Sequence, residues 1–299
     1  MVRITAVALL SLACAAELPG SMAVEADLVS PPVGVKITYL ANEGFLLVSG
    51  EQKVLIDALF PGITHYSAVP EPTRSRLESA KPPFDGVDLV LATHFHDDHF
   101  GAREVARHLA ASGAVFLSTP QVAELLRPKL TGRAANIWAH FPEEGERTTV
   151  SHAGIDVTIL NLHHGRDRNP PVENLGFLLE LGGLRILHIG DTEVSKNDIR
   201  PYRLNEAQID VALVPSWFLA EPQWQGVVEE IQPARVVAMH LATAKAPRSW
   251  FGSAGSRARR VEGIRVAFPS VWIPTEPLET RRFSSSAHRM PAPNRGRIP

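Results

Sequence analysis

Cysteine is almost absent from this 299-residue chain, which contains only Cys14. A single cysteine excludes an intramolecular disulfide and a metal cluster held by thiolates. Any metal chemistry must therefore use histidine, aspartate and glutamate side chains, and the chain has 12 histidines.

An excess of charge of either sign is also missing, because 30 lysines and arginines stand against 32 aspartates and glutamates. The formal net charge of -2 gives no broad electrostatic case for binding nucleic acid. With 44% hydrophobic and 21% charged residues, the composition excludes collagen-like, coiled-coil and wholly disordered chains. We therefore expect a globular protein with a substantial core and a small-molecule partner rather than nucleic acid.

The first residues have the pattern of a secretory signal. In residues 3–16, one arginine precedes a short apolar run that ends in small residues. The run is too short for a comfortable membrane span. Residues 21–23 (Ser-Met-Ala) fit a cleavage site, with residues 13–15 as an alternative. We predict a signal peptide over residues 1–23 and a periplasmic or secreted protein without a membrane span, and a lipid anchor through Cys14 is the less favoured alternative.

The last residues, 280–299, are rich in serine, proline and arginine. They contain no acidic residue and no apolar periodicity. Such a segment has too little apolar surface to bury, so we expect a disordered tail. The folded domain is then predicted to occupy residues 35–275.

Between these ends, strand-like and helical patterns alternate. Short β-type runs at residues 35–40, 45–49 and 53–57 are separated by turn residues and predict an antiparallel meander. Two further hairpins are predicted around Ala153-Gly154 and Gly182-Gly183. Each half of the chain has strands first and helices later, which favours an α/β fold of two sheets packed face to face with helices outside.

Potential metal ligands are concentrated in residues 94–100, His-Phe-His-Asp-Asp-His-Phe. This segment follows an apolar run that we predict to be a buried strand, and it leads into a predicted helix. His94 and His96 are two residues apart, so an extended backbone places them on one side. Asp98 and His99 come from the turn that follows. Four such groups can surround one or two metal ions, whereas burying them unpaired in a core would be costly.

The segment HFHDDH resembles H-x-H-x-D-H, the signature of the metallo-β-lactamase fold hydrolases. The other landmarks follow in the family's order within roughly residues 35–245. They are Asp57 after an early strand, His164 in His-His-Gly, Asp191 in Gly-Asp-Thr and His240 at the end of a strand. Each is weak alone, but together they support the resemblance, which implies a four-layer αββα sandwich of the metallo-β-lactamase type.

The resemblance also implies a set of seven metal ligands. One metal would take His94, His96 and His164, a second would take Asp98, His99 and His240, and Asp191 would bridge them. Imidazole and carboxylate ligands without thiolate suit Zn²⁺, with Mn²⁺ or Fe as alternatives. A hydroxide held by the two metals would attack a carbonyl or phosphoryl centre, and Asp98 would accept a proton from the attacking water.

Two neighbouring histidines compete for one position in this set. His163 adjoins His164, and neighbours on a strand point to opposite faces, so only one can readily bind the same metal. We favour His164 because it precedes a glycine at the strand's end. His188 is predicted to pack or to support a ligand rather than to bind metal. His65 lies in a loop after Asp57 that could cover the site.

The substrate contacts are less specified by the sequence. Trp217 and Phe218 follow a predicted strand and either line a pocket or pack against the helix that carries Trp224. Residues 165–174 are either a lid that carries arginines toward an anionic substrate or a plain surface loop.

One departure from the best-known zinc β-lactamases narrows the functional hypothesis. Those enzymes use a cysteine as a ligand of the second metal, whereas Asp191 occupies the corresponding late position here. This favours the lactonase, glyoxalase II and phosphodiesterase branches over antibiotic hydrolysis. The leading hypothesis is a metal-dependent hydrolase with a dinuclear zinc site that cleaves an ester, lactone or phosphodiester. The alternatives are an iron-dependent redox protein of the same fold and a non-catalytic metal-binding protein.

Overall fold

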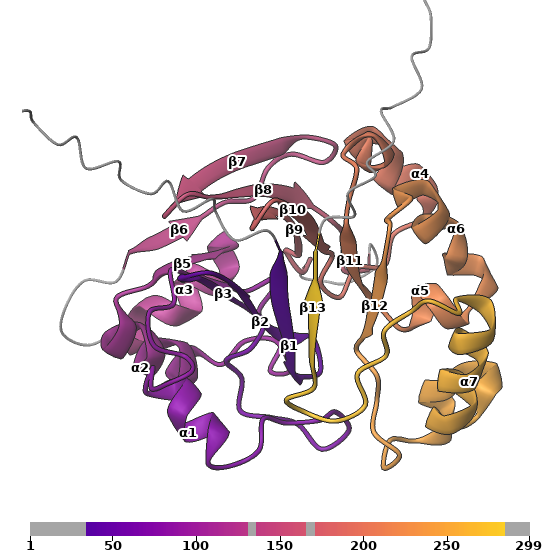
Figure 1. The fold of residues 1–299 in the computed structure, drawn as a ribbon, viewed down its shortest axis with the longest axis horizontal. Coiled ribbons are helices and arrows are strands. Elements are labelled where there is room, and N and C mark those ends of the chain that lie inside the picture. Colours follow the sequence, from indigo (N-terminus) through magenta and orange to yellow (C-terminus); the bar gives the residue numbers. More distant parts are fainter. Residues whose placement is uncertain (1–33, 131–135, 166–170, 285–299) are drawn as a thin grey trace, which may run out of the picture. The chain divides into compact units, whose positions relative to one another are not determined.

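The computed structural model describes residues 34–130, 136–165 and 171–284 (Figure 1). All of them belong to one structural unit of the chain, residues 31–299. The predicted signal peptide over residues 1–23 and the lipid-anchor hypothesis at Cys14 lie outside the described residues. Within the described ranges, every helix is too short or too polar to cross a membrane.

The first sheet combines an antiparallel and a parallel half. Its strand order is β13-β1-β2-β3-β4-β5-β6. β1, β2 and β3 form the predicted antiparallel meander, and β3 to β6 run parallel to one another. The strands are β1 (Val35–Ala41), β2 (Gly44–Ser49), β3 (Gln52–Ile56), β4 (Leu89–Leu91), β5 (Val115–Ser118), β6 (Ile137–Ala139) and β13 (Thr280–Phe283).

The second sheet has the strand order β12-β11-β10-β9-β8-β7. Both predicted hairpins are confirmed, because β7 pairs with β8 and β9 pairs with β10 in antiparallel register. β10, β11 and β12 run parallel. The strands are β7 (Arg147–His152), β8 (Ile155–Asn161), β9 (Leu175–Leu181), β10 (Leu184–His188), β11 (Val211–Pro215) and β12 (Val236–Met239).

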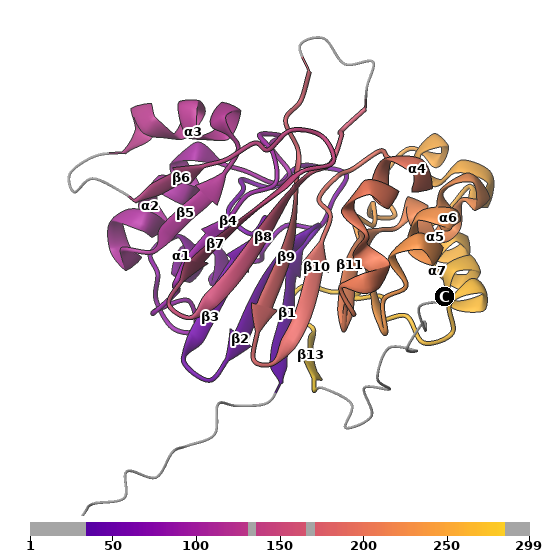
Figure 2. The ribbon, with the colours of Figure 1, turned by 90° about the horizontal axis from the view of Figure 1, so that it is seen from above.

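Helices cover the outer face of each sheet, and Figures 1 and 2 show the two groups on opposite sides of the paired sheets. The first sheet carries α1 (Thr73–Glu78), α2 (Ala102–Ser112), α3 (Pro120–Leu126) and the 3₁₀ turn η1 (Arg127–Lys129). The second carries α4 (Lys196–Ile199), η2 (Arg200–Tyr202), η3 (Leu204–Glu206), α5 (Trp217–Ala220), α6 (Pro222–Ile231), η4 (Arg248–Ala254) and α7 (Arg257–Ala267).

Side-chain alternation along the strands explains the layers. On β2, Phe45 and Leu47 join the core between the two sheets, whereas Leu46 joins the core beneath α1 to α3. β3 repeats the pattern, with Leu55 facing the helices and its neighbours facing the other sheet. Because successive residues of a strand point to opposite faces, a strand buried on both faces must be continuously apolar. The predicted four-layer αββα sandwich is thereby confirmed.

The predicted start of the disordered tail was wrong. Residues 280–283 form β13, which pairs antiparallel with β1 and extends the folded domain beyond residue 275. Only Phe283 of this strand is buried, and its ring packs 6.1 Å from that of Trp272. The backbone pairing along the edge of β1 therefore stabilises a segment whose arginine-rich sequence carries almost no apolar signal. Residues 285–299 lie outside the described part of the chain.

Candidate metal centre

The predicted ligands lie where strands end. His94 follows β4, His164 follows β8, Asp191 follows β10 and His240 follows β12. Polar groups at such positions leave the regular backbone pairing and reach the edge where the two sheets meet. A set of residues that is dispersed over the sequence is thereby brought into one place.

Four side chains form the first group of candidate ligands. Nε2 of His94 lies 2.9 Å from Nδ1 of His96, which lies 3.1 Å from Nε2 of His164. That nitrogen is 3.2 Å from Oδ2 of Asp191. One ligand atom of each of the four lies within 4.8 Å of the others, which is the spacing that a single metal ion needs.

A second group adjoins the first. Oδ2 of Asp98 lies 3.3 Å from Nε2 of His240 and 3.7 Å from Nε2 of His99. Nε2 of His240 is also 3.7 Å from Oδ2 of Asp191. Asp191 therefore contacts both groups, which is the position of a bridging carboxylate.

The electrostatics around His94, His96 and Asp98 favour the protonation states that bind metal. Burial and the neighbouring imidazoles lower the pKa of His94 well below its usual value and that of His96 to about 4, so both rings are neutral near pH 7. Burial alone would raise the pKa of Asp98, but the imidazoles of His240 and His99 outweigh it and hold the pKa at about 2. Neutral imidazole and ionised carboxylate are the forms that donate electron pairs to a metal.

Two buried nitrogens in the cluster have poorly satisfied hydrogen bonding within the described part of the chain. Nε2 of His99 and Nε2 of His240 are buried and make no well-formed hydrogen bond among the described residues. Both face carboxylate oxygens at distances longer than a good hydrogen bond. Imidazole nitrogens that face carboxylates in this way fit the ligands of a metal ion better than a plain polar core. The donor set, without thiolate, suits the metals expected from the sequence.

Asp57 anchors the ligand-bearing turn from behind. Its Oδ1 accepts a hydrogen bond from the backbone N–H of Thr93 at 2.7 Å, and its Oδ2 accepts one from the Thr93 hydroxyl at 2.7 Å. Oδ2 also lies 2.9 Å from Nδ1 of His99. Burial lowers the pKa of His99, but the carboxylates of Glu43, Asp57 and Asp98 outweigh this and raise it to about 10. The Asp57 contact directs Nε2 of His99 into the cluster.

The turn between β1 and β2 supplies two residues whose roles the sequence did not specify. Nδ2 of Asn42 donates to Oδ2 of Asp98 at 3.2 Å. Glu43 is fully buried, its Oε2 lies 3.5 Å from Nδ1 of His99, and neither carboxyl oxygen makes a hydrogen bond among the described residues. Burial raises the pKa of Glu43 well above its usual value. In the sequence, the only indication of a special role for Glu43 is that a charged residue occupies a tight turn between two apolar runs.

The neighbouring histidines and aspartate that were not predicted as ligands lie outside the two ligand groups. Nε2 of His163 lies 3.0 Å from Oε2 of Glu144, away from the cluster that His164 joins. His188 is buried, and its Nε2 donates a hydrogen bond to the backbone carbonyl of Glu43 at 3.1 Å, so it supports the turn; with Glu43 and Asp57 it forms a further group outside the seven predicted ligands. Asp97 is exposed.

A cavity of about 350 Å³ opens beside the two groups of ligands. Trp217 lines it, whereas Phe218 is fully buried with its ring 5.9 Å from that of Trp224. The sequence left open whether these two residues line a pocket or pack against the helix of Trp224. Trp217 does the first and Phe218 does the second. His65 is not among the residues that line the cavity, but its ring lies 4.9 Å from that of Trp250, which does line it. Residues 166–170 of the proposed lid lie outside the described ranges.

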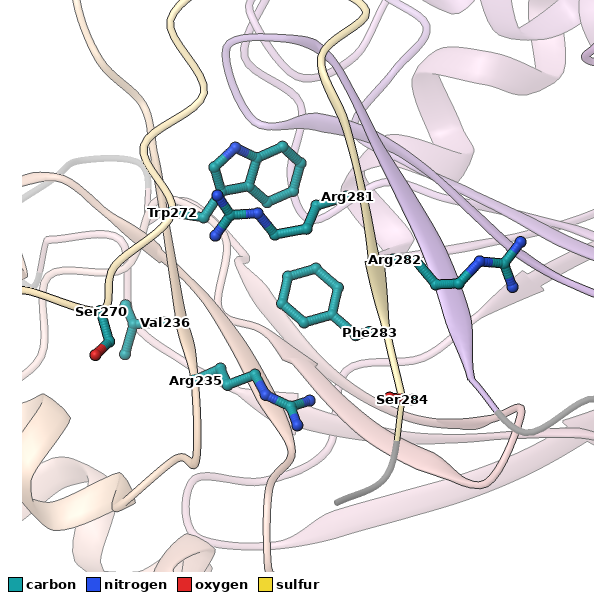
Figure 3. A pocket seen from close by; sticks show the side chains of 8 residues that line it. All are labelled: Arg235, Val236, Ser270, Trp272, Arg281, Arg282, Phe283 and Ser284. Atoms are coloured by element: carbon teal, nitrogen blue, oxygen red, sulfur yellow. The ribbon is translucent and has the colours of Figure 1, made fainter. Parts of the chain in front are cut away.

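A second hollow, of about 410 Å³, lies beside β12 and β13 (Figure 3). The guanidinium of Arg281 lies 5.3 Å from the ring centroid of Trp272, and that of Arg235 lies 5.9 Å from the ring of Phe283. Figure 3 shows Arg282 turned to the other side of β13. No histidine or carboxylate is among the described residues that line this hollow, so it is not a second metal centre.

Known proteins resemble this chain in both sequence and structure. Residues 52–251 match the family model described as the beta-lactamase superfamily domain. A metal-dependent hydrolase of Pyrococcus abyssi is 30% identical over 214 residues, which cover 70% of this chain and 85% of that protein. A metal-dependent hydrolase of Pyrococcus furiosus is 28% identical with the same coverage.

Solved structures of low sequence identity share the fold. Igni18, a metallo hydrolase from Ignicoccus hospitalis, has a TM-score of 0.54 at 20% identity and covers 85% of this chain and 100% of its own. CmlA, a diiron β-hydroxylase from Streptomyces venezuelae, has a TM-score of 0.56 at 15% identity, with coverage of 85% and 55%. The chain belongs to the beta-lactamase superfamily and is a metal-dependent hydrolase of the metallo-β-lactamase fold.

Proposed function

We propose that this protein cleaves an ester, a lactone or a phosphodiester at a dinuclear zinc centre. The observation that carries the proposal is the pair of ligand groups that share the carboxylate of Asp191. A single metal would need only one of these groups. Two groups with a shared carboxylate are typical of centres that hold two ions about 3.5–4 Å apart.

The proposed assignment uses all seven predicted ligands. His94, His96 and His164 would hold the first ion, Asp98, His99 and His240 would hold the second, and Asp191 would serve both. When bound, the metal pair supplies Lewis acidity and lowers the pKa of water, so that hydroxide is available near neutral pH.

Within this centre, the chain's own residues orient the attacking water. Asp98 is ionised, and the side-chain amide of Asn42 fixes the orientation of its carboxylate. The carboxylate of Asp98 can therefore accept a hydrogen bond and a proton from the attacking water. The cavity that His164, Asp191 and His240 line receives the substrate.

The test combines elemental analysis with a substrate panel of esters, lactones, phosphodiesters and β-lactams. We expect zinc to co-purify and at least one of the first three classes to be hydrolysed. His96→Ala should abolish turnover, because it removes a ligand from the centre of the first group. Full turnover by that variant would reject the mechanism.

A redox function is the second candidate. Its support is the structural likeness to the diiron CmlA and the buried carboxyl of Glu43 beside the second group, because combinations of histidine and carboxylate ligands also suit iron. Iron content together with oxygen uptake, in place of hydrolysis, would favour it over the zinc hydrolase.

We also propose that residues 1–23 are removed on export to the periplasm or the exterior. Mass spectrometry of the mature amino terminus tests this proposal. A mature protein that begins at residue 1 would contradict it, and one that begins at a lipid-modified Cys14 would favour the anchor.

A further inference from the structure

The cavity beside the candidate ligands is rich in aromatic side chains. Three of the chain's five tryptophans line it, namely Trp217, Trp224 and Trp250, and Tyr66 adds a fourth ring. Three of the seven candidate ligands line it as well, among them His240. Its volume of about 350 Å³ suits a small molecule. Aromatic walls and reacting groups therefore belong to one cavity.

Two of the rings stand directly against a candidate ligand. The Tyr66 ring lies 4.3 Å from the His240 ring, with an interplanar angle of 74°. The Trp217 ring lies 5.1 Å from the same imidazole, at 72°. In a substrate whose carbonyl or phosphoryl centre lies beside the candidate metal ligands, the group attached to that centre would therefore contact aromatic side chains.

The rim of the cavity leaves apolar surface unburied. Trp250 is 42% exposed, and its ring lies 5.7 Å from that of Tyr66. Covering such surface with an apolar group stabilises a complex by roughly 25 cal/mol for each Å² removed from water. A planar ring would gain more, because offset or edge-to-face aromatic contacts add about 0.5–1.5 kcal/mol.

Two residues that line the cavity also carry donors without an acceptor among the described residues. Nε1 of Trp217 and Nε of Arg260 are buried and make no hydrogen bond among the described residues. The Arg260 side chain is 7% exposed, and its Nη2 donates to Oε1 of Glu221 at 2.9 Å. This ion pair balances the charge of Arg260, so the cavity does not require an anion. The two free N–H groups call for an oxygen acceptor on the ligand.

We propose that the substrate carries a planar aromatic ring with an oxygen acceptor, which lies among Trp217, Trp250 and Tyr66 while the scissile bond reaches the ligands. The inference rests on the proposed function for the identity of that bond. The inference adds the chemical class of the group that is attached to the scissile bond. The ring stacks on the aromatic walls, and the oxygen receives a hydrogen bond from Trp217 or Arg260.

The kinetic test uses esters that differ only in the ring. Methyl phenylacetate and methyl cyclohexylacetate share the leaving group, and a CH₂ group separates each ring from the carbonyl. We expect kcat/KM to be about three- to tenfold higher for the aromatic ester. Trp250→Leu should remove this preference, whereas Phe141→Leu should keep it, because Phe141 is also exposed but does not line the cavity.

A further variant tests the acceptor. Trp217→Phe keeps an aromatic ring and removes the N–H donor. A 4-methoxy group on the ring of methyl phenylacetate should raise kcat/KM in the unmodified protein. The gain should shrink in Trp217→Phe. An unchanged gain would assign the acceptor contact to Arg260, and no gain in either protein would overturn the acceptor part of the proposal.

A binding measurement separates this proposal from the proposed function. Titration calorimetry of the metal-free protein should show tighter binding of 2-phenylethanol than of 2-cyclohexylethanol, and Trp250→Leu should abolish the difference. If this holds while no ester, lactone or phosphodiester is hydrolysed, the proposed function fails and the aromatic site stands. If both esters are hydrolysed equally and Trp250→Leu changes nothing, the aromatic site is overturned. Absence of both binding and hydrolysis overturns both.

Discussion

Oδ2 of Asp57 lies 2.9 Å from Nδ1 of His99, and both side chains are fully buried. This contact orients the His99 ring so that its Nε2 lies 3.7 Å from the carboxylate of Asp98. The position of one predicted ligand therefore depends on a residue from the end of β3, more than forty positions earlier in the chain.

Replacing Asp57 by asparagine should weaken the second metal position. Asparagine keeps the size of the side chain and tolerates the left-handed backbone at this residue, where φ is 44°. It loses the charge that orients His99, so we expect metal affinity to fall about 10- to 100-fold. Titration calorimetry with Zn²⁺ measures this. Asp88→Asn is the control, because Asp88 accepts a hydrogen bond from the Lys53 backbone, outside the cluster. Equal affinity in the two variants would contradict the role of Asp57.

Removing one ligand from each group should separate the two metal positions. His94→Ala lies in the first group and His240→Ala in the second. Each should lower the metal content after dialysis from two ions per chain to one, because the other group keeps its ligands. Elemental analysis against protein concentration measures the ratio. A mononuclear centre would instead lose all of its metal in one variant and none in the other.

The backbone at Gly190, just before Asp191, should not accept a side chain. Its φ is +58°, and an added Cβ would lie 2.7 Å from Oδ1 of Asn174 and 2.8 Å from Cβ of Thr93. Left-handed strain and overpacking together predict a loss of about 2–5 kcal/mol in the free energy of unfolding for Gly190→Ala. Gly183→Ala, with φ of +72° and no atom within 4 Å, should lose only about 1–2 kcal/mol. Urea unfolding measures both, and equal losses would show that the close contacts do not matter.

The sequence was sufficient for the groups that occupy strand ends. Apolar runs define β4, β10 and β12, and the polar residue that follows such a run is conspicuous, as at His94, Asp191 and His240. Apolar runs separated by turn residues likewise predicted both hairpins and the antiparallel meander. These features depend on local alternation of side chains, which a single sequence displays.

The remaining parts depend on contacts between distant segments. Tyr66 comes from a loop after β3 and Trp250 from η4, and only the folded chain places their rings 5.7 Å apart. Glu43 is buried in the β1–β2 turn, where its backbone carbonyl contacts His188 of β10, 145 positions later in the chain. β13 has one buried side chain and is held by pairing with β1. Local pattern carries no information about such partners.

A buried histidine far from the cluster should make folding stability depend on pH. His108 on α2 is fully buried, and its Nδ1 donates to the carbonyl of Leu77 at 2.6 Å. Burial lowers its pKa below 6.5, and the bond to Leu77 offsets only part of that effect. Above pH 6.5 both folded and unfolded states are neutral at this residue. As the pH falls below 6.5, the unfolded chain takes up the proton first and stability is lost.

Replacing His108 tests whether folding stability falls as the pH is lowered. His108→Gln keeps a donor for Leu77 and cannot titrate. Below pH 6.5 the free energy of unfolding of the unmodified protein should fall more steeply than that of the variant, by at most about 1.4 kcal/mol per pH unit. Urea unfolding of metal-free protein between about pH 5 and pH 8 measures the two slopes. Parallel slopes would mean that His108 is protonated equally in both states.

Anomalous diffraction from crystals grown with zinc, recorded at the zinc absorption edge, locates the metal ions directly. We expect two peaks, one on either side of the Asp191 carboxylate, the first among His94, His96 and His164 and the second among Asp98, His99 and His240. A single peak, or peaks that leave either group of side chains without metal, would contradict a dinuclear centre.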